Sequence, residues 1–539
     1  MKAGARAAIA GALALAACSS VTAGHRSRES NAWTVPGVLR YAIDEDPKSL
    51  NPAVFPFEPT YSLAMFAFAW AVQYDEKARP FPDALRELPT RSNGDVSPDG
   101  LTLRYKLARG LTWQDGDPLT CADLRFTWQL IVNPHSLVYL TEGYSDIRNI
   151  DCSDPYVAVV HMKRVYAPFL PEFWSPYGWV PILPEHILKP YYDARGSLNV
   201  APYNALPVGS GPFRIARWRR GDEIRLSAFS GYLRGRPRLK EVDFKILPVP
   251  SQLVSLQSHA VDMIAGSAMD WPRFRTLAAD PRNGLRTRLV DEFAWAHIDF
   301  NMQREFVADR RVRVALAYAL DRRSIIEKVF HGVVVASETD QDPRFSWAAT
   351  NDIAHYPYDP KRARAILDAA GWRVGPDGIR VKNGRRLEFS FSACTEHTGE
   401  VEAQAVVQQQ WRSIGVQTDV KNYSHNLFLD ASPAGILTGG RYDVAIISTE
   451  SGPDPDRFGD YDDLRWTNAA VSKALDAALH TVDQRKRKRY YVFVQQQIAR
   501  EVPTIVIGFI RTPLLYNSDL KDLRWSPVST FIGTSRYSI

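Results

Sequence analysis

The stretch Gly110–Trp128, GLTWQDGDPLTCADLRFTW, carries the signals of three local structures in direct succession. Asp115-Gly116 is a strong signal for the two-residue turn of a β-hairpin. Thr120 is placed to cap a helix, and Asp123 stands three residues later in the position of a capping box. The stretch therefore predicts a strand, a tight turn and a capped helix, with its two tryptophans in the core.

Strand and helix signals continue on both sides of this stretch. Apolar and polar residues alternate in Leu101–Leu107, LTLRYKL, as in a strand with one buried face. Asp309, Asp321 and Asp359 each precede a segment with helical spacing of apolar residues and are predicted N-caps. Because 539 residues far exceed one hydrophobic core, we expect about three or four structural units of mixed α/β type.

The composition is that of an ordered globular protein, with 45% hydrophobic and 23% charged residues. A net charge of +6 is small for this length and is spread along the chain, so nucleic acid is not an expected partner. We interpret the one dense basic run, Arg485–Arg489, as the solvated face of a helix, with phosphate binding as the alternative.

The N-terminus has the features of an export signal, which we assign to residues 1–17. Lys2 and Arg6 precede the uncharged run Ala7–Ala17, which is shorter than the ~20 apolar residues of a membrane-spanning helix. The following Leu15–Cys18 resembles a bacterial lipobox, which implies acylation of Cys18 and makes residues 18–34 a lipidated polar tether on the membrane surface. An ordinary cleaved signal that contains a cysteine is the alternative.

Three other cysteines are present. An exported chain enters an oxidising compartment, and Cys121 and Cys152 fall in one predicted lobe, so we expect them to form a disulfide. Cys394 is then a lone thiol, which we interpret as a small buried apolar residue.

The specific motifs of exported hydrolases and cofactor sites are absent from the sequence, and the match of Ser518–Lys521 to the short pattern S-x-x-K is expected by chance in a long chain. The 11 histidines form no H-E-x-x-H, and neither Ser210 nor Ser267 lies in a G-x-S-x-G. The acidic run Asp454–Asp463 lacks the register of an EF-hand loop. We expect no catalysis, no cofactor and no metal.

Eight blocks in order resemble the bacterial extracellular solute-binding proteins of family 5, which serve peptide and nickel ABC importers. The blocks are LRYAIDEDPKSLNPA, LARGLTWQDGDPLTCADLRFTW, PILPEHIL, PVGSGPFRIARW, RRVRVALAYALDRRSIIEKV, YDPKRARAILDAAGW, YDVAIIS...DPD and RYYVFVQQQIAREVPTIVI. The resemblance implies an α/β fold, a two-lobed periplasmic-binding-protein-like clamp with an extra domain, in which helices flank mixed sheets. It places domain I at 35–69, 206–292 and 512–539, domain II at 70–205, and domain III at 293–511.

The resemblance also suggests where a ligand binds, between domains I and III. Relatives that bind free peptides carry a Trp and an Asp in the loop after a YD pair, and here Thr449 stands near the usual Trp. Glu450 and Asp454 are the nearest carboxylates. Dipeptide-binding relatives also carry an Arg in the segment that here reads SACTEHTGE, where Glu396 and His397 are candidates to contact a cationic or hydroxyl-rich ligand. Exposed loop roles are the alternative for both.

Three more residues are candidates to line the cleft. Asn51 follows the first strand, and its amide is placed to bond a ligand backbone or to stabilise the turn before Pro52. Trp295 and Asn301 begin the predicted domain III, with core packing as the alternative for Trp295.

These inferences predict an extracytoplasmic, membrane-anchored lipoprotein that acts as a monomer. It would capture a small-molecule or oligopeptide-like ligand by hinge closure and deliver it to the permease subunits of an ABC importer. The sequence leaves open whether the ligand is a peptide, sugar, chelate or opine. An exported hydrolase or a solute sensor on the same fold is the alternative function.

Overall fold

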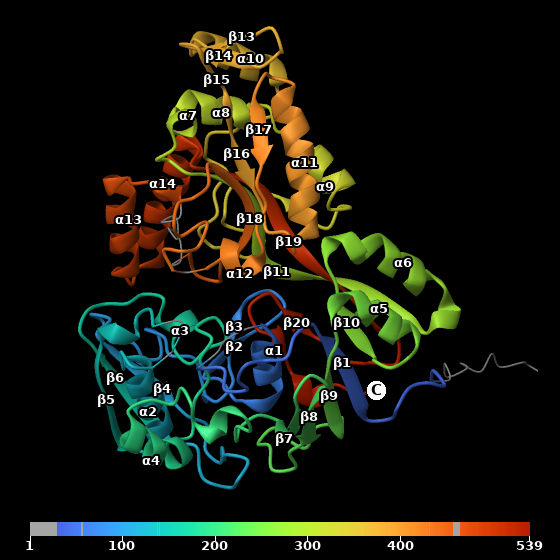
Figure 1. The fold of residues 1–539 in the computed structure, drawn as a ribbon. Helices are drawn as coiled ribbons and strands as arrows, with labels where there is room; N and C mark the ends of the chain where they lie inside the picture. Colours follow the sequence, from blue (N-terminus) through green and yellow to red (C-terminus); the bar gives the residue numbers. More distant parts are fainter. Residues whose placement is uncertain (1–29, 55–57, 137, 139–140, 431, 456–463) are drawn as a thin grey trace, which may run out of the picture.

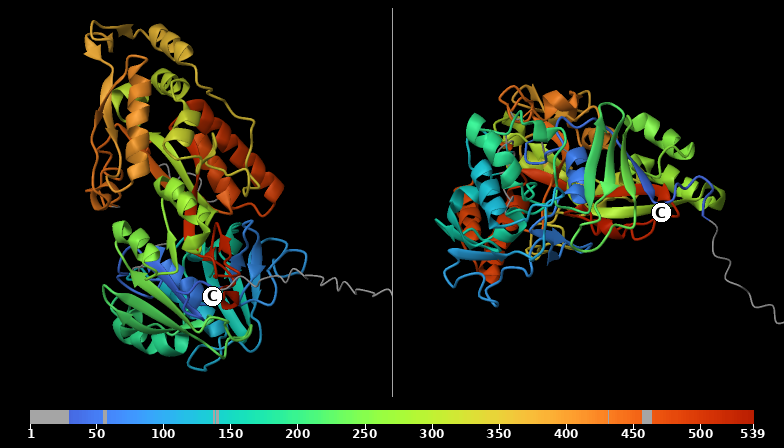
Figure 2. Two further views of the ribbon diagram at one scale, coloured as in Figure 1. Left: turned by 90° about the vertical axis from the view of Figure 1, so that its right-hand side faces the viewer. Right: turned by 90° about the horizontal axis from the view of Figure 1, so that it is seen from below.

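Two long antiparallel strands, β11 (Leu285–Phe300) and β19 (Thr504–Asn517), run from one lobe of the molecule into the other (Figure 1). The computed structural model describes residues 30–54, 58–136, 138, 141–430, 432–455 and 464–539. From Trp295 to Phe300 every residue of β11 is buried, as expected where the upper lobe covers both faces of the strand. Figure 2 shows the same two lobes from two further directions.

One mixed sheet of eleven strands continues through both lobes along these two strands. Its order is β17-β16-β18-β11-β19-β10-β1-β9-β8-β7, and β12 pairs with β19 off this path. In the lower lobe β1 runs parallel to β9 and β10, and β7, β8 and β9 are antiparallel. These lower strands are β1 (Val38–Ile43), β7 (Phe213–Arg219), β8 (Glu223–Ala228), β9 (Glu241–Ile246) and β10 (Met263–Ala265).

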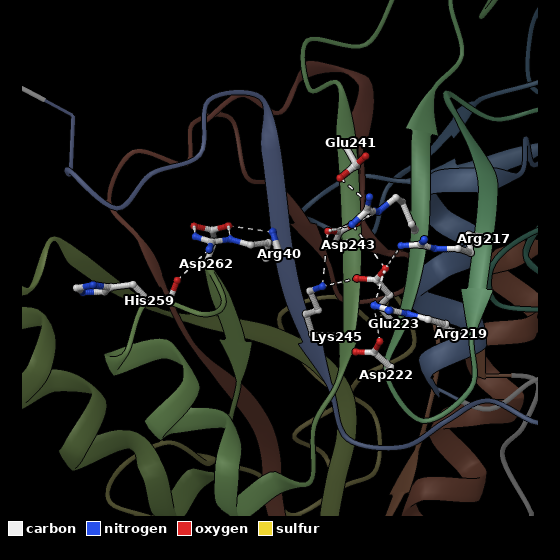
Figure 3. A network of polar contacts seen from close by, with 11 residues as sticks. Arg40, Arg217, Arg219, Asp222, Glu223, Glu241, Asp243, Lys245, His259 and Asp262 are labelled. Atoms are coloured by element: carbon white, nitrogen blue, oxygen red, sulfur yellow. Dashed lines mark hydrogen bonds and ion pairs between the residues drawn. The ribbon is translucent and has the colours of Figure 1, made fainter.

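Ion pairs cross the lower strands on a polar face of the sheet (Figure 3). Asp262 accepts from Arg40 Nε at 2.8 Å and from its backbone N at 2.9 Å, which joins β1 to the start of β10. The Glu223 side chain is 1% exposed and lies between Lys245 and Arg217 from the neighbouring strands. The Lys245 ammonium, then the Arg217 guanidinium, hold the pKa of Glu223 at about 2, below its ordinary 4.5.

The opening stretch of the sequence lies in the lower lobe and folds largely as predicted. Helix α2 (Cys121–Ile131) is capped by Thr120, whose hydroxyl accepts from Ala122 N at 3.3 Å, while Asp123 accepts from Thr120 N at 2.7 Å. The capping box is therefore confirmed. The turn before it is closed by a single bridge between Thr112 and Pro118, not by two full strands.

A small sheet, β4-β6-β5, packs beside α2. Its strands are β4 (Thr102–Lys106), β5 (Ile147–Asp154) and β6 (Val157–Met162), so the predicted strand at 101–107 is present. Cys121 at the start of α2 and Cys152 in β5 are joined by a disulfide. Trp113 is fully buried and Trp128 packs against the same core, so both tryptophans are scaffold.

The lower lobe is completed by short elements around these two sheets. They are α1 (Glu58–Ala67), α3 (Phe169–Glu172), α4 (Glu185–Arg195), α5 (Val249–Gln257), α6 (Trp271–Ala279), β2 (Val72–Tyr74), β3 (Pro80–Pro82), β20 (Trp525–Ser526) and β21 (Thr530–Phe531). The segments predicted for domain I supply the strands of its large sheet, while the exact domain limits stay a prediction.

The upper lobe has a separate core around its end of the large sheet. Its strands are β12 (Val335–Ala336), β16 (Glu388–Ser392), β17 (Gln417–Val420) and β18 (Val444–Glu450), with the small sheet β13 (Arg373–Val374), β14 (Arg380–Lys382) and β15 (Arg385–Arg386). Its helices are α7 (Glu305–Ala308), α8 (Arg310–Tyr318), α9 (Arg322–Lys328), α10 (Pro360–Ala369), α11 (Thr398–Arg412), α12 (His425–Phe428), α13 (Ala469–Leu479) and α14 (Gln484–Glu501).

Local helix signals in this lobe were sufficient to find three helix starts. The side chains of Asp309, Asp321 and Asp359 each accept a hydrogen bond from a backbone N–H in the first turn of α8, α9 and α10, which confirms the predicted caps. Within the described ranges, no helix has both the length and the apolar character needed to cross a membrane.

Candidate functional site

The pairing of β11 with β19 is interrupted where the two strands pass between the lobes. Asp291 pairs with Arg511 and Trp295 pairs with Phe509, so three residues of β11 stand opposite Ile510 alone. Such a bulge bends the strand and turns its side chains away from the regular alternation. Two of the three bulged residues, Glu292 and Phe293, line a cavity between the lobes.

This cavity has a volume of about 350 Å³. Its lower wall comes from the end of β1, from α1 and α5, and from the β20–β21 hairpin, while Glu450 and Ser451 at the end of β18 form its upper wall. Ser451 is held against the bulge, because its backbone N and its Oγ both donate to Phe293 O, at 3.1 and 3.2 Å. Residues of both lobes therefore line one cavity, which lies where the pairing of β11 with β19 changes register.

Aromatic rings form much of the wall. They are Tyr41, Tyr61, Tyr177, Trp179, Phe293 and Trp525. Tyr61 stacks on Trp179 with ring centroids 5.4 Å apart, and its hydroxyl donates to Val528 O at 2.6 Å. These contacts fix two rings before any ligand arrives, which reduces the ordering cost of binding.

The charged side chains that the described residues contribute to the wall are all acidic. Asp44, Glu292 and Glu450 contribute carboxylates, and among the described residues that line the cavity there is no Lys, Arg or His. A concave site lined by one sign of charge attracts a ligand of the opposite sign, and aromatic faces also attract cations. The cavity is therefore suited to a positively charged group.

The two lobes touch beside the cavity. Gly452, in the loop after β18, is buried against the ring of Tyr177 from the segment between α3 and α4. Nearby, Ala167 N of the lower lobe donates to Leu479 O at the end of α13, at 2.8 Å. The two lobes are therefore in contact in this structure.

Of the predicted ligand residues, Glu450 lines the cavity. Thr449 precedes it on β18 and pairs with Trp295 on β11, so these three residues lie together. The Trp295 side chain stacks on His297 at 3.9 Å between ring centroids and is 5% exposed, while Thr449 Oγ1 lies 3.0 Å from His297 Nε2. Trp295 and Thr449 support the upper wall, and their contact with a ligand stays a prediction.

The two asparagines that were predicted to line the cleft are buried in backbone turns. Asn51 Nδ2 donates to Asn204 Oδ1 at 2.9 Å, and its Oδ1 accepts from Ala53 N at 3.2 Å. Asn301 Nδ2 donates to Gly440 O and Tyr442 O, at 3.1 and 3.0 Å. Both amides therefore stabilise the chain around them, and neither residue is part of the described lining of the cavity.

Asp454 is not part of the described cavity lining and forms a buried ion pair. Its carboxylate accepts from Arg487 Nη1 at 2.8 Å and Nη2 at 2.5 Å. Burial disfavours the charged guanidinium, but Asp454 and then Tyr491 outweigh burial and raise the pKa of Arg487. The interpretation of Arg485–Arg489 as a solvated face is wrong for Arg487, which points into the lobe. A ligand role for Asp454 would require this pair to open.

Glu396 and His397 lie at the start of α11, outside the cavity lining. Glu396 Oε2 accepts from Thr395 Oγ1 at 2.7 Å, from His425 N at 2.9 Å and from Cys394 Sγ at 3.3 Å. The Thr395 hydroxyl and then the Cys394 thiol hold the pKa of Glu396 at about 2. Hydrogen bonding to Glu400 raises the pKa of His397. Their ligand contact also stays a prediction, and Cys18 lies outside the described residues.

Sequence reasoning missed most of the cavity. Tyr41, Asp44, Tyr61, Trp179 and Trp525 come from segments that are far apart in the chain. No local spacing connects them, because the fold alone brings them together. The one local indication of the cavity was the segment Thr449–Glu450, which departs from the Trp and Asp that peptide-binding relatives carry in this loop.

Two lobes joined by two continuous strands, with a cavity at the register break between them, define a solute-binding protein of the clamp type. The sequence profile of the bacterial extracellular solute-binding proteins, family 5 (middle region), matches residues 85–464. The chain therefore belongs to this family, which is one of binding proteins and not of enzymes. The expected family and fold are confirmed.

Individual relatives are distant but match over nearly their whole length. The chain is 23% identical to the oligopeptide-binding protein AppA of Bacillus subtilis, over 96% of this chain and 94% of AppA. It is 23% identical to the dipeptide-binding protein of Escherichia coli, over 87% and 89% of the two chains.

Solved structures show the same fold. NikZ of Campylobacter jejuni in complex with Ni(L-His) matches with a TM-score of 0.79 at 23% identity, covering 94% of this chain and 100% of NikZ. AppA of Bacillus subtilis in complex with a nonapeptide matches with a TM-score of 0.75 at 22% identity, covering 93% and 99%.

Proposed function

We propose that the protein captures a cationic, peptide-like solute in the cavity between its lobes and delivers it intact to the permease of an ABC importer. Relatives named as oligopeptide-binding, dipeptide-binding and ABC transporter peptide-binding proteins support the peptide and the importer. The observation that carries the choice of ligand is the acidic and aromatic cavity wall. Asp44, Glu292 and Glu450 contribute the three carboxylates of this wall.

The acidic cavity wall favours the ammonium end of a peptide over its carboxylate end. An ammonium about 4 Å from a carboxylate gains about 4 kcal/mol at an effective dielectric of about 20, before desolvation is subtracted. A ligand carboxylate in the same place would be repelled by a similar energy. We therefore place the peptide ammonium, or a cationic side chain, in this cavity and the carboxyl end away from it.

The size of the cavity favours a short ligand. About 350 Å³ lies near the lower end of the range of ~300–1,000 Å³ for small-molecule pockets. Reversible hydrogen bonds and bridging waters would hold the solute, because a carrier must release it again.

The N-terminal sequence supports an extracytoplasmic lipoprotein. Residues 1–17 would be removed as a signal peptide, and acylated Cys18 with residues 18–34 would tether the protein to a membrane surface. The proposed domain limits are 35–69, 206–292 and 512–539 for domain I, 70–205 for domain II and 293–511 for domain III. The protein would act as a monomer, presenting one clamp to the permease.

Thermal unfolding with matched peptides tests the ligand class. Tripeptides of one length are compared in cationic, neutral, acidic and N-acetylated forms, since a ligand that binds the native state raises the melting temperature. Cationic peptides with a free ammonium should give the largest rise. Acidic or acetylated peptides that give an equal rise would contradict the proposal.

Variants locate the binding in the cavity. Glu450→Gln and Glu292→Gln should each reduce the affinity for the tightest-binding cationic peptide by tenfold or more. Glu327→Gln removes a carboxylate on the exposed surface of α9 and should leave the affinity unchanged. Mass spectrometry of the peptide after incubation should recover it whole, and cleavage products would instead support a hydrolase.

A further inference from the structure

Three potential metal ligands meet in the upper lobe. Cys394 follows β16, His397 precedes the first residue of α11, and His425 is the first residue of α12. One ligand atom from each lies within 4.8 Å of the other two. These residues are separate from the lining of the cavity.

The donor set suits a borderline transition metal. A thiolate and two imidazoles bind Zn²⁺, Co²⁺ or copper more readily than they bind Mg²⁺ or Ca²⁺. Metal–ligand bonds of about 2.0–2.3 Å place tetrahedral ligand atoms about 3.3–3.8 Å apart. A limit of 4.8 Å therefore leaves about 1 Å of side-chain movement for the cluster to close on an ion.

A second layer of contacts already orients the first imidazole. His397 Nδ1 lies 3.1 Å from Oε2 of Glu400, a carboxylate that is 6% exposed. When Nδ1 carries the proton in this contact, Nε2 has the free lone pair that a metal requires. Carboxylate–histidine pairs of this kind are typical partners of metal ligands.

A single carboxylate connects the three segments that carry the ligands. Glu396 Oε2 accepts from Cys394 Sγ at 3.3 Å and from His425 N at 2.9 Å. The rings of His397 and His425 lie 5.7 Å apart between centroids. The donors are thus held near one another by existing hydrogen bonds, and the surrounding carboxylates add negative charge.

We propose that Cys394, His397 and His425 form a binding site for one Zn²⁺-class metal ion. When the ion binds, a sulfur–metal bond replaces the S–H bond of Cys394 and the proton passes to solvent. Three protein ligands leave a fourth position for water or a further ligand.

Cobalt is a suitable probe because a Co²⁺–thiolate bond absorbs in the near ultraviolet. The test uses the full chain with Cys18→Ala, so that Cys394 is the one cysteine outside the disulfide. Titration with CoCl₂ should saturate at one equivalent, with a charge-transfer band and the strong visible bands of four-coordinate Co²⁺. ZnCl₂ should then displace the cobalt and remove both.

Variants assign the ligands. Cys394→Ser should abolish the charge-transfer band. His397→Gln and His425→Gln each remove a ligand and should weaken binding by at least the roughly 10- to 100-fold that is typical when only a partner of a ligand is changed. His135→Gln, an exposed histidine of the lower lobe, is the matched control and should bind Co²⁺ normally. Circular dichroism and melting temperature verify that each variant is folded. A charge-transfer band that survives Cys394→Ser in a folded protein, or a spectrum of six-coordinate Co²⁺ alone, would overturn the proposal.

Discussion

Replacing Gly452 by alanine should weaken ligand binding without unfolding either lobe. Gly452 belongs to the upper lobe and Tyr177 to the lower lobe, and the two residues pack directly together beside the cavity. A Cβ on Gly452 would approach the Tyr177 ring to well under 3.0 Å, a separation that Cβ atoms essentially never show. The lobes can relieve this overlap by moving apart, so the penalty falls on the closed arrangement.

The size of the effect follows from the overlap. Carbon atoms pack best at about 3.5–4.0 Å, so the contact must open considerably to admit the methyl group. Overpacking of this kind costs about 1–3 kcal/mol. If the ligand binds the closed form, the same free energy weakens binding. At 1.4 kcal/mol per tenfold, the dissociation constant should rise by about 5- to 150-fold.

A double-mutant cycle measures this contact separately from other effects of the substitution. Isothermal titration calorimetry with the tightest-binding peptide of the screen gives affinities for the wild type, Gly452→Ala, Tyr177→Ala and the double variant. Because Tyr177→Ala removes the ring, Gly452→Ala should then cost less than about threefold. An equal loss of affinity in both backgrounds, or no loss in either, would show that the contact between Gly452 and Tyr177 does not control ligand affinity.

Three further predictions concern stability. Asp454→Ala leaves Arg487 buried without its carboxylate and should lower the free energy of unfolding by about 3–5 kcal/mol, seen as a lower melting temperature of the ligand-free protein; an unchanged melting temperature would contradict a structural role. Because Lys245 and then Arg217 hold the pKa of Glu223 at about 2, its contribution to stability is complete above about pH 4.5 and is lost as the pH falls toward 2. Glu223→Gln should therefore reduce the loss of stability that urea unfolding measures in this acid range. Replacing Cys121 and Cys152 by serine removes a disulfide between residues 31 positions apart and should lower the free energy of unfolding by about 4 kcal/mol. A reductant should destabilise the wild type but not this variant.

Helix starts were predictable from sequence because capping is local chemistry. Thr120 and Asp123 meet within one turn, and Asp309 bonds a backbone N–H two residues ahead. No distant residue is needed for either interaction, so the order of residue types carries the information. The arrangement of the lobes was predicted from the eight sequence blocks that resemble the solute-binding family, because local signals carry no information about it.

Partners that lie far apart in the sequence explain what could not be predicted. Asp454 was visible as a carboxylate near the expected peptide anchor, but Arg487, its partner, is 33 residues away on α14. The spacing of Cys394 and His397 was visible too, as a C-x₂-H pair. His425 joins them only because β17 and its following turn bring α12 beside the start of α11.

The position of the cavity suggests how binding is coupled to closure. Glu292 lies in the β11 bulge, and Glu450 lies at the end of β18, which pairs with the next part of β11. Asp44 faces them from the end of β1 in the lower lobe. Closing the lobes gathers the carboxylates of Asp44, Glu292 and Glu450 around one cavity, where a bound cation is attracted by all three. A cationic solute would then stabilise the closed form more than the open form, and this difference in affinity, not tight binding as such, is what shifts the equilibrium toward closure.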